Sequence, residues 1–563
     1  MMTVIHGKWP SDKVAPALAL AGDYETRLWM QEQAVDEMLR KLTQDPAAFC
    51  LSVPGGWCLA ATLADGTLLL AADRVGMRDL YYTQHAGSIG YSEKIADFRK
   101  IPGWSTGTDH ARVCEYMAYR RIAGRHTMYT NVDRVEPGTY VCFRTGSCEP
   151  VLQRYWTYHW DVDDGLRFAD AQQQLKDGLI AAGQQMQAAG VAPFCMLSGG
   201  VDSAAALWAM RQVQPNVPVV AATICPDVAS CSEWDDAQRI ARHLGAQAEP
   251  IRVTADTLLA HLDHVHAVLE QPVVHTIACL HDALFAAMAE RGFRSFVTGE
   301  AADTLFGYDR FARYHWIWAH AGCPSSLFEL RRTLRDGAMR MLARTGWSKA
   351  QLWAGLTGPD WRTFVCMGRR YFGDDVLRNI VRDYQPQDAS RLAILEQADA
   401  RTRLEQVSHF YFETFIQDCR IFGALGAARG LEACFPFVNS AIRQLALGLP
   451  PAYKFKGMSG KYLLKAAMDP QLPQGIAWGR KRSGEQPLGK WMREHAGLRE
   501  RVEEACGAGA SVAEYFETEA LGRLVWEHMD NKADHSVLLW QVVSLEAWLG
   551  RAGGLCWFEP RRH

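Results

Sequence analysis

A short stretch near the middle of the chain combines the residue types that bind a phosphate group. Residues 194–197 form an apolar run typical of a buried strand, residues 198–200 read Ser-Gly-Gly, and residues 203–210 favour a helix. A strand, a glycine turn and a helix start together direct backbone N–H groups and the positive end of a helix dipole at one point. Adjacent glycines let the backbone approach an anion closely. Asp202 stands where a carboxylate could bind a divalent cation.

Two other segments supply charged side chains that suit phosphate chemistry. Residues 298–308 follow an apolar, strand-like run and place Glu300 and Asp303 on one loop. A metal ion held by such carboxylates can bind phosphoryl oxygens and stabilise a departing pyrophosphate. Lys461 and Lys481 stand 20 residues apart in a block rich in basic residues and glycine. Two cations that converge on a phosphate stabilise the negative charge of a transition state.

The elements that must position these residues follow from the alternation of apolar runs with helical stretches. This alternation predicts a parallel sheet covered by helices on both faces, with ligands bound beyond the carboxyl ends of the strands. From about residue 310 onward the pattern is mostly helical, so residues 161–563 are predicted to form one α/β domain with a large helical part. The expected parallel strands lie near residues 194–197, 217–225, 248–253 and 294–300.

The first 160 residues are predicted to form a mainly β, two-layer domain. Apolar and polar positions alternate around turns at residues 64–66 and 86–87, which is typical of two hairpins. Two more strands are expected within residues 132–156, and one helix within residues 34–42. The domains are therefore residues 1–160 and 161–563.

The chemical segments resemble one superfamily. Residues 198–203, SGGVDS, lack the GK[ST] of a Walker loop and resemble the SGGxDS loop of the ATP-pyrophosphatases, which cleave ATP between its α and β phosphates. Residues 298–308, TGEAADTLFGY, resemble the SGEGADExFxGY of the class B asparagine synthetases. Residues 430–487 resemble the GLExRxPFLD block of that family and the lysines that follow it. The resemblance extends over about residues 55–550.

This resemblance implies ATP and Mg²⁺ as cofactors and gives roles to residues of this sequence. Asp202 and Asp303 would share the magnesium ion, and Glu300 would contact the acid being activated or position the attacking amine. Lys461 and Lys481 would stabilise the α-phosphate and the leaving pyrophosphate. Backbone groups at Leu197 and at the end of the second strand would read adenine. The expected ATP-binding residues are Leu197, Ser198, Gly199, Gly200, Asp202, Ser203, Thr223 and Gly299.

The first domain resembles the glutaminase domain of the same family, which has the fold of N-terminal-nucleophile (Ntn) hydrolases. Residues 73–82, DRVGMRDLYY, parallel the family's DRxGxxPLYY. That glutaminase uses a cysteine at the mature N-terminus, whereas this sequence begins Met1-Met2-Thr3 and its first cysteine is Cys50. The family's RGPD and NYxEL segments also have no counterpart. We therefore expect a domain without glutaminase activity, retained as a scaffold or as a surface for a partner.

Several positions depart from the family pattern near the expected acid-binding region. The family's Asp-Arg-x-Ser-Met segment is replaced by the small residues 423–427, and its PFLD becomes PFVN, with Asn439 in place of the aspartate. The loss of charge and bulk favours an acyl substrate other than free aspartate. Residues 270–272, Glu-Gln-Pro, keep the family's ExP pattern, whose loop is expected near the acid substrate.

Composition narrows the setting of this chemistry. The chain has 563 residues and a net charge of -3, so a general nucleic-acid binder, which carries a basic excess, is not expected. Its 15 cysteines show neither CxxC pairs nor zinc-type spacing, which indicates reduced thiols. Without an apolar signal segment or a membrane-spanning stretch, a cytoplasmic protein is expected.

These features predict an AMP-forming amide ligase. Chains of this superfamily without the glutaminase nucleophile are often intramolecular amide formers, and the favoured group is the lasso-peptide macrolactam synthetases. That resemblance implies a precursor peptide substrate, a leader-binding protein and a cysteine-protease partner. The alternatives are a β-lactam synthetase-type small-molecule ligase, which usually carries tyrosine where this chain has Glu300, and an ammonia-dependent relative of asparagine synthetase. A decayed homologue that serves as a regulatory or scaffold subunit is a further alternative, which the intact phosphate loop disfavours.

Overall fold

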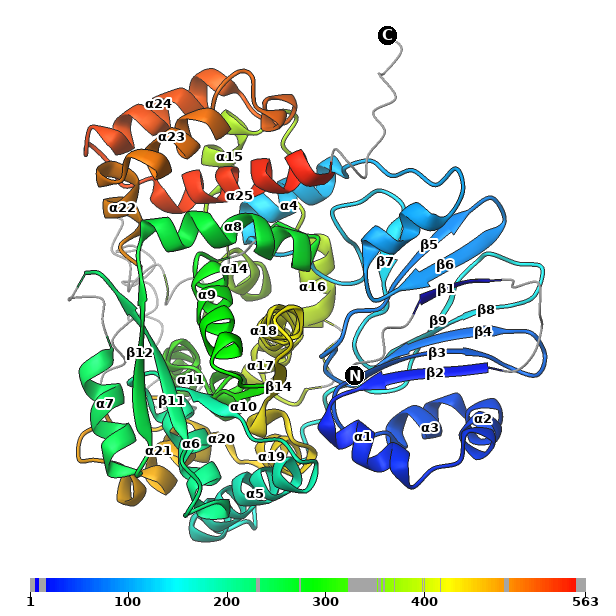
Figure 1. Cartoon of the computed structure of the whole chain (residues 1–563), viewed down its shortest axis with the longest axis vertical. Helices are drawn as coiled ribbons and strands as arrows, with labels where there is room; N and C mark the ends of the chain where they lie inside the picture. Colours follow the sequence, from blue (N-terminus) through cyan, green and yellow to red (C-terminus); the bar gives the residue numbers. More distant parts are fainter. Residues whose placement is uncertain are drawn as a thin grey trace, which may run out of the picture.

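Three β-sheets and a large set of helices make up the chain (Figure 1). The computed structural model describes residues 6–9, 17–228, 233–272, 275–321, 352, 356–357, 360–368, 370–396, 398, 400–415, 417–479 and 486–552. Two of the sheets belong to the N-terminal part of the chain and the third belongs to the C-terminal part. This arrangement confirms the predicted order of a mainly β domain followed by an α/β domain.

Two antiparallel sheets pack face to face in the N-terminal domain (Figure 1). Side chains alternate along the β3 strand, so that Cys58 and Ala60 face the second sheet while Leu59 and Ala61 face helices. Because both faces are buried, nearly every position of this strand is apolar. The first sheet, in the order β2-β3-β4-β8-β9, contains β2 (Ala17–Gly22), β3 (Trp57–Thr62), β4 (Leu68–Ala72), β8 (Thr139–Phe143) and β9 (Val151–Arg154). The second, in the order β1-β6-β5-β7, contains β1 (His6–Trp9), β6 (Ser88–Ser92), β5 (Tyr81–His85) and β7 (Val132–Arg134).

Helices cover the outer faces of this sandwich. Met38, Leu42 and Phe49 pack against the β3 and β4 strands and close one apolar core. Both predicted hairpins are confirmed, and in the second turn Ala86 and Gly87 take positive φ, as a two-residue hairpin turn requires. The sequence did not reveal β2, α1 and α3, and it indicated two strands where β7, β8 and β9 occur. The helices are α1 (Tyr24–Gln31), α2 (Val35–Gln44), which confirms the predicted helix, α3 (Pro46–Ser52), η1 (Ile95–Lys100) and α4 (His110–Tyr119).

The C-terminal domain is built on a five-stranded sheet in the order β12-β11-β10-β13-β14. All four pairings are parallel, which confirms the predicted sheet type. The strand order reverses between β10 and β13, and the carboxyl ends of strands at such a switch point leave a crevice for ligands. The strands are β10 (Phe194–Met196), β11 (Val220–Pro226), β12 (Gln247–Val253), β13 (Ser295–Val297) and β14 (Glu432–Cys434).

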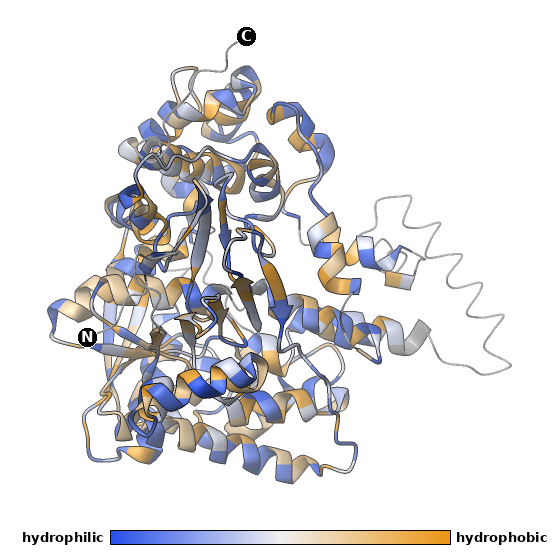
Figure 2. Ribbon diagram, turned by 90° about the vertical axis from the view of Figure 1, so that its right-hand side faces the viewer, coloured by the Kyte–Doolittle hydropathy of each residue, from blue (hydrophilic) through white to orange (hydrophobic). Residues whose placement is uncertain are grey.

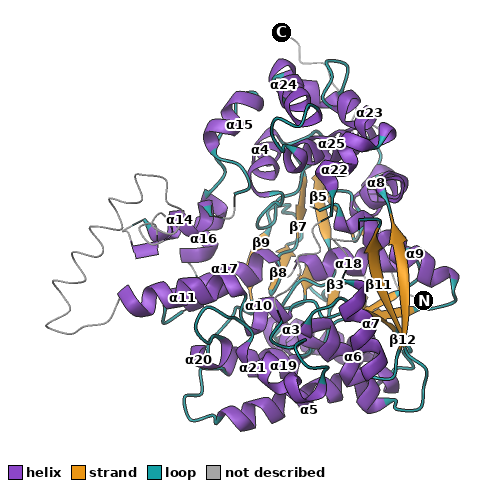
Figure 3. Cartoon of the chain, turned by 90° about the vertical axis from the view of Figure 1, so that its left-hand side faces the viewer, coloured by secondary structure: helices purple, strands orange, loops and turns teal. Residues whose placement is uncertain are grey.

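Helices cover both faces of this sheet (Figure 3). One layer contains α5, α6 and α7, and the opposite layer contains α8, α9 and α18. The outer helices show bands of hydrophilic and hydrophobic residues, as amphipathic helices do when one side faces a core (Figure 2). These helices are α5 (Phe168–Ala188), α6 (Val201–Val213), α7 (Trp234–His243), α8 (Ala255–Leu269), α9 (Ile277–Glu290) and α18 (Gln417–Ala428).

The remainder of the described chain is mostly helical, as predicted, with β14 as the exception. Three residues of β14 complete the sheet edge beside β13, a pairing too short to leave a periodic sequence signal. No helix within the described ranges has the length and apolar character needed to cross a bilayer. The further helices are α10 (Ala302–Phe306), α11 (Asp309–Ala321), α14 (Trp361–Met367), α15 (Asp374–Ile380), α16 (Ala389–Glu396), α17 (Arg403–Phe415), α19 (Ser440–Gly448), α20 (Pro451–Lys454), α21 (Tyr462–Met468), α22 (Leu488–Glu494), α23 (Ala496–Ala505), α24 (Thr518–Met529) and α25 (Ser536–Ala552).

The two domains are joined by buried polar contacts as well as by the chain itself. The carboxylate of Glu270, at the end of α8, accepts hydrogen bonds from the backbone N–H groups of Ile95 (2.6 Å) and Ala96 (2.7 Å) in the N-terminal domain. Tyr116 of α4 and Gln541 of α25 form a second contact between the domains. The Tyr116 hydroxyl donates to the backbone carbonyl of Gln541, and the Gln541 Nε2 donates to the backbone carbonyl of Tyr116. The expected place of Glu270 near the acid substrate stays a prediction, and its carboxylate is bound at the domain interface. The ExP segment therefore holds the domains together.

Replacing Glu270 with glutamine is expected to change how stability depends on pH. Burial raises the pKa of Glu270 to about 7 from its ordinary 4.5, and the two backbone N–H groups only partly oppose this shift. Between these two pKa values the folded chain holds a proton that the unfolded chain has released. The free energy of unfolding therefore falls as pH rises, by up to about 1.4 kcal/mol per pH unit. The unfolding temperature of Glu270→Gln minus that of the wild type should therefore rise between about pH 5 and about pH 8. Calorimetry that finds a constant difference would contradict this assignment.

Candidate active site

The predicted phosphate loop lies between β10 and α6, at the carboxyl end of the central strand. The hydroxyl of Ser203 braces it, because its Oγ accepts from the backbone N–H of Ser198 (3.0 Å) and lies 2.9 Å from the Oγ of the same residue. Gly200 is the N-cap residue of α6 and has no side chain that could accept a hydrogen bond from the start of this helix. The first backbone N–H groups of α6 therefore receive no acceptor from the N-cap residue and can donate to a ligand. Gly199 packs against α7, where a Cβ would lie 3.0 Å from the Cβ of Asp236. The loop is thus a preformed anion-binding turn.

Gly299, in the loop after β13, lies directly against this turn. A Cβ on Gly299 would lie 2.4 Å from both the carbonyl carbon of Asp202 and the backbone nitrogen of Ser203. Contacts this short are not tolerated, so only glycine fits between the two loops. The close approach explains why both loops can face one ligand.

Two predicted metal ligands and one predicted lysine converge at this point. The Nζ of Lys461 lies 2.8 Å from the Oδ2 of Asp202 and 2.8 Å from the Oδ1 of Asp303. Lys461 is buried, and burial alone lowers its pKa, but the two carboxylates outweigh that effect and raise it. Its backbone has a positive φ of 55° at the start of α21, which turns the side chain into the site. The ammonium is therefore held charged between two acids that stand 101 residues apart in sequence.

Asp202 and Asp303 border a cavity of about 520 Å³ at the switch point of the sheet, and Lys461 contacts both of them without lining the cavity itself. Leu197, just after β10, and Thr223 and Ile224 of β11 line this cavity, and their expected contacts with adenine stay a prediction. Glu300 lines the cavity beside Asp303, and aromatic rings of Tyr308, Tyr371 and Tyr411 border another side. Among the predicted ATP-binding residues, the lining includes Leu197, Ser198, Asp202, Ser203, Thr223 and Gly299.

The donor set fits a nucleotide with a divalent cation. The buried hydroxyl of Thr223 lines the cavity, and within the described chain its Oγ1 has no hydrogen-bond partner, which is typical of a group that meets a ligand. Asp202 and Asp303 already converge on one cationic centre, the ammonium of Lys461. Carboxylate oxygens are the ligands that Mg²⁺ prefers, and phosphates complete its shell. The residues present could therefore hold Mg²⁺ and a triphosphate together.

Comparison with known proteins agrees with this geometry. Residues 174–550, well over half of the chain, match the family described as asparagine synthase. The chain belongs to the asparagine synthase family. Its members are ATP-dependent, amide-forming ligases, which accords with an anion-binding turn and paired carboxylates in one cavity. Residues 36–156 match a glutamine amidotransferase domain, so this member of the asparagine synthase family has the two-domain layout of an N-terminal amidotransferase-like domain and a C-terminal synthase domain.

Three known proteins are similar in sequence to this member of the asparagine synthase family over most of its length. A putative glutamine-hydrolysing asparagine synthetase of Mycobacterium tuberculosis is 25% identical over 507 residues, which cover 85% of this chain and 74% of the relative. Glutamine-hydrolysing asparagine synthetase 1 of Bacillus subtilis is 20% identical over 502 residues, covering 86% and 75% of the two chains. Amidase chyE of Penicillium rubens is 24% identical over 467 residues, with coverage of 73% and 66%.

Two further residues that the sequence analysis singled out in this family member are Lys481 and Asn439. Lys481 lies outside the described residues, so its predicted role stays a prediction. Asn439 does not line the cavity; it caps α19 and donates from Nδ2 to Glu25 (3.0 Å) and to Gln185 (2.8 Å). The PFVN departure therefore alters a contact between the domains and is no sign of the acyl substrate.

Several cavity residues gave no sequence signal. His275, His281 and Asp418 line the cavity on the side of α9 and α18, next to Glu300. The pKa of His281 is lowered to about 4 because the ring is buried, so this imidazole is neutral. These residues stand singly among helical segments, and only the packing of α9 against α18 brings them to the site. A family alignment of these two helices is the one signal that could have indicated them.

Proposed function

We propose that the chain is an ATP-dependent cyclase that activates a side-chain carboxylate of a precursor peptide and closes a macrolactam with the peptide's N-terminal amine. A carboxylate oxygen attacks the α-phosphorus of ATP, which forms an acyl-adenylate and releases pyrophosphate. The amine then attacks the acyl carbon, loses a proton and expels AMP. The convergence of Asp202, Asp303 and Lys461 beside the phosphate loop carries the activation step. Magnesium bound by the two aspartates would neutralise phosphate charge.

The positions of the other groups assign the remaining tasks. Lys461, oriented by both carboxylates, offsets negative charge on the pyrophosphate as it leaves. Glu300, farther along the same cavity, faces the region beyond the phosphates, where the acid and the attacking amine must meet. A carboxylate there can orient a protonated amine and accept its proton. Lys481 remains the proposed second cation.

The size of the space around α18 supports a substrate larger than aspartate. Small residues of this helix, Gly423, Ala424, Ala427 and Ala428, border a second cavity of about 510 Å³ between the two domains. Larger side chains at these positions would fill part of it. Together with the nucleotide cavity, this space favours an extended acyl substrate such as a peptide.

The cysteines of the N-terminal domain support the loss of glutaminase activity. Cys50 is buried, and burial raises the pKa of its thiol to about 12, while the pKa of Cys142 is raised to about 11 for the same reason. A thiol is a nucleophile only as a thiolate, so neither group can attack glutamine at neutral pH. We therefore infer that the amine is supplied by the substrate, with this domain as a scaffold for the precursor peptide, a leader-binding protein or a cysteine-protease partner.

Two other functions fit the same activation chemistry. A small-molecule amide ligase of the β-lactam synthetase type would also join an amine and an acid within one molecule. An ammonia-dependent relative of asparagine synthetase would use free ammonia. The Mycobacterium and Bacillus relatives are named glutamine-hydrolysing asparagine synthetases, which supports aspartate as the acid in this second candidate. Both share the site of Asp202 and Asp303 and differ only in the substrates.

One experiment separates these functions. The protein is incubated with Mg-ATP and either aspartate plus ammonium or linear peptides that carry an internal acidic residue, and the products are weighed by mass spectrometry. The proposal predicts a peptide lighter by one water, together with AMP and pyrophosphate. Asparagine formation without any cyclic peptide would overturn the proposal and establish an ammonia-fed synthetase. The absence of AMP with every acid would overturn the activation step itself.

A further inference from the structure

A small cavity of about 80 Å³ lies between the domains and is unusually rich in arginine. Arg120, Arg121 and Arg134 reach it from the N-terminal domain, and Arg420 reaches it from α18. Asp79 also lines this cavity, and it occupies the position of the proline in the family's DRxGxxPLYY segment. None of these residues belongs to the nucleotide cavity described above.

The described carboxylates do not balance these guanidinium groups. Arg121 pairs with Asp418 at 2.6 Å, so its charge is compensated. Asp79 serves two arginines, at 3.1 Å from Arg420 and 3.8 Å from Arg134. For the fourth, Arg120, no ion pair occurs within the described ranges of the chain; its nearest groups are the Nδ1 of His275 (3.4 Å) and the ring of Tyr371 (4.1 Å from Cζ). The cavity therefore has an excess of positive charge.

Buried donors at this cavity point to a missing acceptor. The Nε groups of Arg120 and Arg134 and the Nε2 of Gln271 are buried, and among the described residues no acceptor meets them. Arg120 is only 6% exposed and Arg134 only 8%. Burial lowers the pKa of Arg134, and the neighbouring charge of Arg420 lowers it further, against smaller opposing effects of Asp79, Tyr81 and Glu136. Unpaired, desolvated guanidinium donors are costly, and an anionic acceptor relieves that cost.

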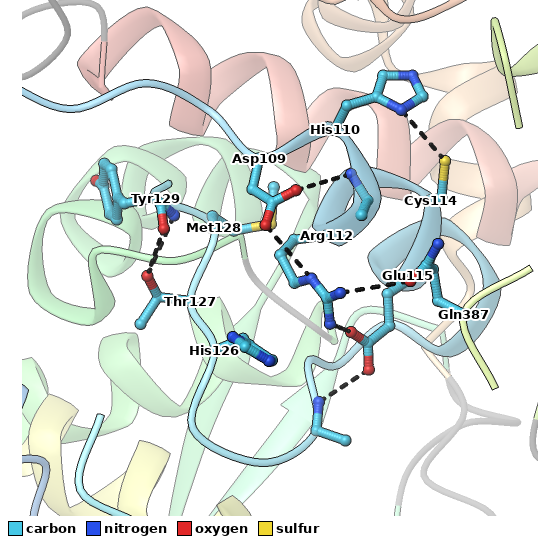
Figure 4. Close-up of polar contacts among 12 residues, drawn as sticks. Asp109, His110, Arg112, Cys114, Glu115, His126, Thr127, Met128, Tyr129 and Gln387 are labelled. Carbon is cyan, nitrogen blue, oxygen red and sulfur yellow. Dashed lines mark hydrogen bonds and ion pairs between the residues drawn. The ribbon is translucent and has the colours of Figure 1, made fainter. Parts of the chain in front are cut away.

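The loop that carries Arg120 and Arg121 is held in place from behind. Figure 4 shows Glu115 of α4 between the guanidinium of Arg112 (2.6 Å) and a backbone N–H of the following loop, that of Ala123 (2.9 Å). Arg391 of α16 pairs with the same carboxylate. Arg120 itself has a positive φ of 59° and ends α4. This support keeps the donors of the loop in one arrangement, which reduces the entropy cost of binding a ligand.

The arginine-lined cavity lies next to the proposed acid-binding region. It shares Leu269 and Ile421 with a third cavity of about 200 Å³, which is lined also by Glu300 and His275. Those last two residues line the nucleotide cavity as well. The arginines therefore lie beside the region that Glu300 and His275 line.

We propose that this arginine-lined cavity binds a second carboxylate of the acyl substrate, apart from the carboxyl group that ATP activates. The inference rests on the proposed function and names its substrate class, an acid that carries a further anionic group, such as a second acidic side chain or a chain terminus of a peptide. Guanidinium groups match carboxylates in planar, two-pronged hydrogen bonds. Arg420 lies one helical turn before Ala424, the position of the arginine in the family's Asp-Arg-x-Ser-Met segment. The positive charge also disfavours passage of an ammonium ion through this cavity.

Length-matched acids test this assignment without ATP. Binding of glutarate, pimelate and azelate is compared by calorimetry with binding of valerate, heptanoate and nonanoate to the full-length protein. At least one diacid should bind about tenfold to a hundredfold more tightly than its monoacid. Arg120→Gln should remove this preference, and Arg120→Lys should keep part of it. Arg291→Gln, which breaks the surface pair of Arg291 with Glu249, is the matched control and should leave it unchanged.

The possible results distinguish the inference from the function on which it rests. Equal binding of diacids and monoacids, or a preference that survives Arg120→Gln, would overturn the arginine site. Inorganic phosphate that binds in an Arg120-dependent way and more tightly than every diacid would also overturn it, in favour of a phosphate site. If Mg-ATP binds and acids support AMP formation while the diacid preference is absent, only the arginine site fails. If the preference is present but no acid yields AMP, the proposed function fails and the anion site stands.

Discussion

Replacement of Asp202 by asparagine is expected to reduce AMP formation about 100-fold to 1,000-fold, which corresponds to about 3–4 kcal/mol of transition-state stabilisation. The asparagine has nearly the same shape but lacks the charge that the cation at this site requires. It also turns one of the two 2.8 Å ion pairs that orient Lys461 into a contact with a neutral group, while Asp303 keeps the other ion pair. The measurement is AMP released with Mg-ATP and the acid that supports the wild-type reaction.

A matched control isolates the effect of charge at the site. Asp256 is highly exposed and pairs with His495 far from the cavity, so Asp256→Asn should retain full activity. Melting curves of both variants show whether either fails to fold. Full AMP formation by a folded Asp202→Asn protein would remove Asp202 from the mechanism and, with it, the proposed metal site.

Replacement of Gly299 by alanine is expected to lower AMP formation about 100-fold, although no reacting group is removed. The new Cβ would lie 2.4 Å from the backbone of Asp202 and Ser203, so one of the two loops must shift. Overpacking of this kind typically costs about 1–3 kcal/mol of stability, and a displacement near 1 Å is enough to misplace the reacting atoms. Activity and the affinity for Mg-ATP should both fall, the latter measured by calorimetry.

A second glycine shows what the same substitution does where space is available. Gly522 lies inside α24 with no atom near the position of an added Cβ, so Gly522→Ala should stabilise the protein by about 0.5–1 kcal/mol and leave activity unchanged. If Gly299→Ala binds Mg-ATP as tightly as the wild type, the two loops do not depend on their close contact and the account of the site fails at that point.

The N-terminal domain has structural tasks whether or not it meets a partner. Glu270 caps a helix of this domain from the other side of the interface, Asn439 binds Glu25, and Glu115 fixes the loop beside the arginine-lined cavity. Removal of the domain would expose the buried side chains of Glu270 and Asn439 in the other domain. Its retention in a chain in which burial raises the pKa of the Cys50 and Cys142 thiols therefore has a physical reason that is independent of glutamine hydrolysis.

The sequence by itself determined the chemistry and the class of both domains. The SGGVDS turn, the acids of residues 298–308 and the alternation of strands with helices are local patterns, because turn geometry and burial periodicity depend on neighbours in the chain. They were sufficient to place Asp202 and Asp303 at the carboxyl ends of two strands. Strand β14 and the strand order were not predictable in this way, because three residues at a sheet edge have no period of their own.

Only the tertiary structure decided what the separated side chains do. Lys461 meets its two acids across 259 and 158 residues of sequence, and Glu270 caps a helix 175 residues earlier. The arginine-lined cavity joins the loop after α4 and strand β7 to helix α18, whose Arg420 lies 286 residues beyond Arg134. Contacts of this kind depend on how the domains pack. Packing depends on the burial of many side chains that are distant in sequence, so no local sequence pattern predicts it.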